Sequence, residues 1–227
     1  MLFDLRSRGR RRTVQAVYLG LAIVMGGGLV LFGVGTGSGF GGLLDAFKGG
    51  GGSGAATQYV SQQEKNDGKR AAQNPSDASA WAALVGDRFS SAGQGSNFNQ
   101  STQTFSSSGK KELAGAADAW QRYLKLVPHP DQQVALVAAR VYEASNDFGN
   151  AASAWEIVAA ANPTVAAYYK SLAIDAYLAK QTRKGDLAGA KAISLTPKAQ
   201  QFVIKQVLQQ AKSSAASGAS TATVPGK

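Results

Sequence analysis

The sequence AADAWQRYLKLVP at 116–128 is followed by AASAWEIVAAANP at 151–163, in which the same residue types recur at the same spacing. Each copy has a small residue, a tryptophan, a large residue and a proline. These positions are Ala116, Trp120, Tyr123 and Pro128 in the first copy and Ala151, Trp155, Val158 and Pro163 in the second. A small residue lets a helix approach its neighbour, an aromatic ring fills the space between helices, and proline ends a helix. The pattern therefore predicts an all-α protein built from repeated helix pairs.

This pattern resembles the second half of a tetratricopeptide (TPR) repeat, a family whose period is about 34 residues. Both copies depart from the family at the third position, where it prefers alanine. Partial matches to the first half of the motif lie at Trp81 and Leu84, at Ala138, Ala139 and Tyr142, and at Tyr169, Leu172 and Ala173. The resemblance implies a short TPR-like helical-hairpin solenoid, as in bacterial single-pass membrane-anchored TPR proteins.

Hydrophobic spacing and helix-ending residues divide the region 56–212 into helices. The helices are expected at 57–73, 77–90, 110–127, 131–145, 148–161, 164–180, 184–195 and 198–212. The last of these is expected to act as a C-terminal capping helix, with Phe202, Val203, Val207 and Leu208 forming one apolar stripe. A repeat array needs such a terminal helix to cover its last exposed core.

Two segments lack a helical pattern. Residues 91–108, SAGQGSNFNQSTQTFSSS, are expected to form a mobile insertion, with Phe98 and Phe105 packing on the helices or contacting a partner. Residues 213–227 have no apolar periodicity and are expected to form a disordered tail.

The N-terminal region predicts a transmembrane helix at 13–35. Its apolar run contains no charged residue, and about 20 apolar residues suffice to cross a bilayer. The basic segment 1–12 holds five arginines, including Arg10, Arg11 and Arg12, so the positive-inside rule places it in the cytoplasm. A Gly-rich linker at 36–55 would connect this anchor to an extracytoplasmic repeat domain at the cell membrane. A cleaved signal is the alternative, which the long apolar run and the lack of an A-x-A site disfavour.

Small residues also lie on one face of the predicted anchor. Ala16, Gly20 and Gly27 are spaced so that a second helix could approach closely. This face permits a homodimer contact within the membrane, in addition to contact with lipid.

The net charge of +10 is concentrated at the two ends of the chain. Residues 1–12 carry +4 and residues 164–227 carry +7, whereas residues 56–163 carry −1. This distribution does not favour a nucleic-acid partner. The lysines of the C-terminal third form either a solvated face or a docking surface for an acidic partner or a membrane.

The sequence shows no set of residues suited to catalysis or cofactor binding. It has no cysteine, and its single histidine, His129, lies between two prolines in a predicted turn. Asp118, Asp131, Asp147 and Asp186 are expected at or near helix starts, where carboxylates are favourable. We therefore expect neither an enzyme, a metal site, a cofactor nor a small-molecule substrate.

Stacked helix pairs form a groove lined by the first helix of each pair, which commonly holds a segment of another protein. Six residues are expected to face it: Gln133, Leu136, Arg140, Glu143, Lys170 and Ile174. The expected function is a membrane-tethered protein–protein interaction module, with a scaffold, assembly or chaperone role for envelope or exported proteins. The alternative is a self-associating structural spacer of the cell envelope that has no client.

Overall fold

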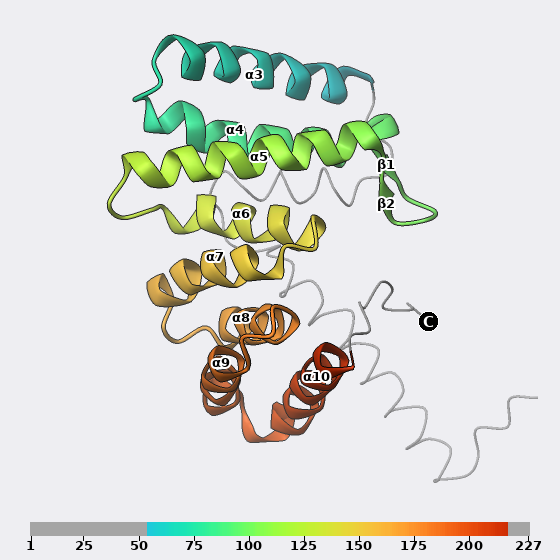
Figure 1. Cartoon of the computed structure of the whole chain (residues 1–227), viewed down its shortest axis with the longest axis vertical. Coiled ribbons are helices and arrows are strands. Elements are labelled where there is room, and N and C mark those ends of the chain that lie inside the picture. Colours follow the sequence, from blue (N-terminus) through green and yellow to red (C-terminus); the bar gives the residue numbers. More distant parts are fainter. Residues whose placement is uncertain (1–53, 218–227) are drawn as a thin grey trace, which may run out of the picture. The chain divides into compact units, whose positions relative to one another are not determined.

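The computed structural model describes residues 54–217 (Figure 1). The chain divides into two compact units, Met1–Asp45 and Ala46–Lys227, and every described residue belongs to the second unit. The predicted anchor, the arginine segment and the contact residues Ala16, Gly20 and Gly27 lie outside the described residues. Within 54–217, no helix has both the length and the apolar character that a membrane span requires.

The described region is all-α apart from one small hairpin, which confirms the predicted fold class at that level. Its elements are α3 (Gly54–Gln73), α4 (Ala78–Ala92), the 3-10 turn η1 (Gly95–Asn97), β1 (Phe98–Asn99), β2 (Thr104–Phe105), α5 (Ser107–Leu126), α6 (Gln132–Ala144), α7 (Phe148–Ala161), α8 (Ala166–Leu178), α9 (Thr182–Leu195) and α10 (Lys198–Ala216).

Consecutive helices pack in pairs, as Figure 1 shows by the order of colours along the stack. The pairs are α4 with α5, α6 with α7, and α8 with α9. Helix α3 packs on α4, whereas α10 packs on α8 and α9. Neighbouring pairs meet through α5 and α6 and through α7 and α8.

The turns inside the second and third pairs have the same geometry, 34 positions apart. Asn146 and Lys180 adopt left-handed backbone conformations, with φ of 58° and 60°. The next residue donates its backbone N–H to a carbonyl five positions back, from Asp147 to Tyr142 at 2.8 Å and from Gln181 to Ala176 at 2.7 Å. Both turns are therefore Schellman caps, in which these hydrogen bonds satisfy carbonyl groups at the ends of α6 and α8.

The tryptophans of the repeated sequence lie in the core. Trp120 and Trp155 are 2% and 1% exposed, and Ala116 and Ala151, four positions before them, are fully buried. The other residues matched to the motif divide by burial. Leu84, Tyr123, Tyr142, Val158, Leu172 and Ala173 are buried, Trp81 and Tyr169 are half-buried, and Pro128 and Pro163 are exposed directly after the helix ends.

Aspartates begin three helices. Asp77, Asp131 and Asp147 are the N-caps of α4, α6 and α7, and each side chain accepts a backbone N–H from the first turn. The expectation that Asp118 lies at or near a helix start is wrong, because Asp118 lies in the middle of α5, whereas Asp186 lies just after the first turn of α9. Each pairs with a cation there, Asp118 with Arg122 at 2.9 Å and Asp186 with Lys212 at 2.7 Å.

The segment 91–108 contains the end of α4, the turn η1, the β1–β2 hairpin and the beginning of α5, and its expected mobility stays a prediction. Its short polar side chains bond to nearby backbone groups, as such residues do in turns. Asn97 donates to the carbonyl of Ser91, and Asn99 accepts from the N–H groups of Ser101 and Thr102. Phe98 and Phe105 face each other across the hairpin, with ring centroids 4.8 Å apart.

Several expected helix boundaries also differ from the structure. Helix α9 begins at Thr182 rather than 184, and α10 continues to Ala216, beyond the expected start of the tail at 213. Helix α3 begins at Gly54, inside the expected linker. The expectation for α10 is wrong in its packing as well, because only Leu208 of the apolar stripe is buried; Phe202, Val203 and Val207 are exposed.

Candidate functional site

An open cleft of about 770 Å³ lies where α7, α8 and α9 meet. Helix α9 supplies most of its walls, α8 and the turn between α8 and α9 supply two residues each, and α7 supplies one. The lining residues are Glu156, Tyr169, Leu172, Lys180, Gln181, Thr182, Arg183, Lys184, Leu187, Ala188 and Lys191. A cleft of this size could hold a few side chains of another molecule.

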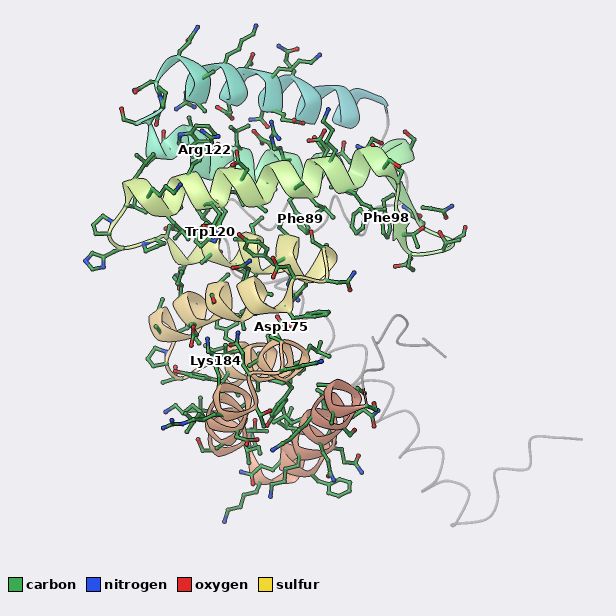
Figure 2. All side chains as sticks on the ribbon, in the orientation of Figure 1. Phe89, Phe98, Trp120, Arg122, Asp175 and Lys184 are labelled. Atoms are coloured by element: carbon green, nitrogen blue, oxygen red, sulfur yellow. The ribbon has the colours of Figure 1, made fainter. Side chains whose placement is uncertain are left out.

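The cleft is cationic. Four of its lining side chains are basic, Lys180, Arg183, Lys184 and Lys191, and one is acidic, Glu156. Lys184 lies 3.0 Å from the Glu156 carboxylate and so connects α9 to α7 (Figure 2). The remaining basic side chains of the cleft exceed the negative charge available within it, so its field favours an anionic ligand.

Apolar side chains lie among these cations. Leu187 is 66% exposed, and Leu172 and Tyr169 contribute from α8. The Lys191 ammonium lies 5.9 Å from the centre of the Tyr169 ring, in the range of a cation–π contact. The cleft therefore combines charge recognition with an apolar surface that a leucine or phenylalanine could cover.

The predicted groove residues fall at a second place, where α6 faces α7 and α8. Arg140 and Glu143 form an ion pair at 2.7 Å, and the Arg140 guanidinium lies 5.0 Å from the centre of the Trp155 ring. The indole N–H of Trp155 donates to the other oxygen of Glu143 at 2.8 Å. Burial and the charge of Arg140 lower the pKa of Lys170. The structure thus brings Arg140, Glu143 and Lys170 close together.

Three other predicted groove residues make no polar contact of this kind. Gln133, Leu136 and Ile174 are half-buried on α6 and α8. None of the six predicted residues lines the α7–α9 cleft. His129 is exposed in the turn between α5 and α6, and residues 54–217 contain no cluster of carboxylate or histidine side chains suited to a metal ion.

Asp175 is the residue that the sequence reading missed. It is 3% exposed on α8 and stands 34 positions after Val141, which is fully buried in α6 (Figure 2). Burial and the neighbouring Glu143 carboxyl raise the pKa of Asp175 to about 8, against the opposing effects of Arg140 and Trp155. One oxygen of Asp175 is inaccessible and has no hydrogen-bond partner. A carboxyl group thus replaces an apolar side chain inside this part of the stack.

A sequence signal for the cleft does exist. Gly185, Gly189 and Ala192 stand 34 positions after Ala151, Trp155 and Val158, and Pro197 stands 34 after Pro163. The third copy therefore lacks its tryptophan, and basic residues gather at the start of the same helix. A Cβ atom at Gly185 would lie 2.5 Å from the Tyr177 ring, so α8 and α9 approach closely there.

Comparison with protein-family models, with curated proteins and with solved structures gives no match for this chain. Functional inference therefore depends on the chain's own residues.

Proposed function

We propose that this chain is a TPR-like interaction module, tethered to the membrane of a bacterial cell envelope, that binds acidic and partly apolar segments of other proteins. The α7–α9 cleft is the binding site in this proposal. Holding such segments near the membrane would suit a scaffold, or a protein that assists the assembly of envelope or exported proteins.

The TPR-like character is supported by period as well as by residue type. The Schellman turns at Asn146 and Lys180 are 34 positions apart, as is the pair Pro163 and Pro197. A TPR has a period of about 34 residues and two helices per repeat. Three consecutive helix pairs agree with this pattern.

The single observation that carries the binding role is the composition of the cleft. Four cations surround an apolar strip that includes Leu187, exposed at 66%. Exposed apolar surface bordered by charge is typical of binding surfaces. Acidic residues of a ligand would meet Arg183 and Lys191, and an adjacent apolar side chain would cover Leu187.

A fluorescent synthetic peptide of alternating glutamate and leucine residues tests this site. We expect the full chain in detergent to raise the anisotropy of this peptide, and not that of the matching lysine–leucine peptide. Arg183→Glu combined with Lys191→Glu should weaken binding roughly tenfold, the loss of about two modest surface ion pairs.

The matched control reverses the same charge at another place. Lys110 and Lys111 are exposed on α5, outside the cleft, so Lys110→Glu with Lys111→Glu should leave peptide binding unchanged. Equal losses in the two double variants would mean that net charge alone attracts the peptide. Binding unaffected by Arg183→Glu and Lys191→Glu would refute the assignment of the cleft.

The tether is tested separately. The sequence predicts a cytoplasmic segment at 1–12, an anchor at 13–35 and the helical domain on the opposite side. If the helical domain lies outside the cytoplasmic membrane, added protease should digest it while that membrane is intact. If the domain lies in the cytoplasm, protease should digest it only after the cells are opened. A helical domain that is digested only after the cells are opened would overturn this topology without affecting the peptide-binding result.

A further inference from the structure

We infer that the exposed face of α10 binds the surface of an anionic lipid bilayer. This surface consists of Phe202, Val203 and Val207 with the flanking Lys198 and Lys205, and we call it the α10 face. It is separate from the α7–α9 cleft, whose lining includes no residue of α10.

The α10 face carries apolar side chains that the described residues, 54–217, leave uncovered. Phe202 is 67% exposed, Val203 is 58% exposed and Val207 is 40% exposed, whereas Leu208 on the opposite side of the helix is 5% exposed. Leu208 comes close to Gly189 of α9, so α10 is already held to the domain by its other side. The exposed residues are therefore free to contact something outside the domain.

Cations flank the most exposed of these side chains. Lys198 precedes Phe202 by four residues and Lys205 follows it by three, so both lie on adjacent turns beside the phenyl ring. Both lysines are exposed, and α10 contains no acidic residue from Lys198 to Ala216. An apolar face edged by lysine, without acidic residues, is typical of a helix that lies in the interface of an anionic bilayer.

A second copy of the chain fits this face less well. A stable interface buries about 800 Å² on each partner, and one large aromatic side chain with two valines supplies only part of that area. Two copies meeting through this face would also bring the same lysines together without a carboxylate on either helix. A bilayer requires neither shape complementarity nor a large area, and its phosphates oppose the lysines.

The chain has no cysteine, which allows a local test in the full-length protein. Val203→Cys would be labelled with a polarity-sensitive fluorophore and reconstituted into phosphatidylcholine vesicles, with or without phosphatidylglycerol. Some of the lipid would carry a nitroxide quencher. In the anionic vesicles we expect blue-shifted emission and quenching, both reversed by salt. The two leaflets have the same composition, so the result does not depend on orientation.

Two controls separate this contact from general proximity to the membrane. A label at Ala114→Cys, exposed on α5, should remain unquenched in the same vesicles. Replacing Lys198 and Lys205 by glutamine should weaken lipid contact at position 203 roughly 30-fold, whereas glutamine at Lys110 and Lys111 should leave it unchanged.

Three results would overturn the inference. The label at position 203 could stay unquenched in anionic vesicles, or it could be quenched equally without phosphatidylglycerol. A blue shift that grows with protein concentration in detergent alone would instead assign the α10 face to a second copy. Peptide binding in the α7–α9 cleft is measured independently, so neither proposal depends on the outcome of the other.

Discussion

Asp175→Asn should remove a large part of the pH dependence of stability. Burial and the Glu143 carboxyl raise the pKa of Asp175 from 3.8 to about 8 in the folded chain. The folded state therefore binds a proton that the unfolded state releases, and stability falls as pH rises between these two values. Asparagine has nearly the same shape and cannot ionise.

The size of the effect follows from the two pKa values. For one independent group, linkage predicts a loss of about 3 kcal/mol in the free energy of unfolding from roughly pH 6 to roughly pH 9. The effects of Arg140 and Trp155, which favour the ionised form, are already included in the pKa of about 8. We expect the variant to match the natural chain at the acidic end and to exceed its stability at the alkaline end.

Urea unfolding of the full chain in detergent, followed by circular dichroism, measures the free energy of unfolding at the acidic and at the alkaline pH. Asp118→Asn is the matched control, because Asp118 is an exposed carboxylate that pairs with Arg122 on the same helix. The control should keep the natural pH dependence. If Asp175→Asn kept it too, or lost stability at high pH, Asp175 would be ionised in the folded chain and the reasoning would be refuted.

Three further substitutions test other parts of the fold. Burial and the Asp67 and Glu64 carboxylates raise the pKa of Asp87 to about 7, so hydrogen-exchange protection of α3 should fall as pH rises through 7, and Asp87→Asn should reduce that fall. Gly185→Ala should lower the unfolding free energy by about 1–3 kcal/mol, since its Cβ would meet the Tyr177 ring. Lys180→Gly should raise the melting temperature by removing a left-handed backbone cost of about 1 kcal/mol, while weakening peptide binding in the cleft.

Short-range spacing predicts much of the fold because helix packing repeats. Trp120 and Trp155 recur at equal spacing from alanines and prolines, and both rings are buried. The all-α class follows from this pattern. The hairpin in segment 91–108 could not be predicted in the same way, because its conformation depends on side-chain hydrogen bonds such as that from Asn97 to the Ser91 carbonyl. Composition alone does not distinguish such a hairpin from a flexible loop.

Burial on α10 was mispredicted for a related reason. Phe202, Val203, Val207 and Leu208 fit one broad apolar stripe when the helix is considered alone. Which part of that stripe is buried depends on where α8 and α9 stand, and they contact the side that carries Leu208. An isolated helix pattern gives the width of an apolar face and not the identity of its partner.

The burial of Asp175 becomes informative when its helix pair is compared with the preceding pair. In the sequence it is one acid between Ile174 and Ala176, typical of a solvated helix. Aligned with the preceding pair, it occupies the place of the buried Val141 and faces Glu143, where an apolar residue would cost less. A copy that departs from its own repeat at a buried position retains a titratable group at a cost in stability. Asp175→Asn measures the part of that cost that comes from ionisation, and a function at the α6–α8 contact would explain why the carboxyl group is retained.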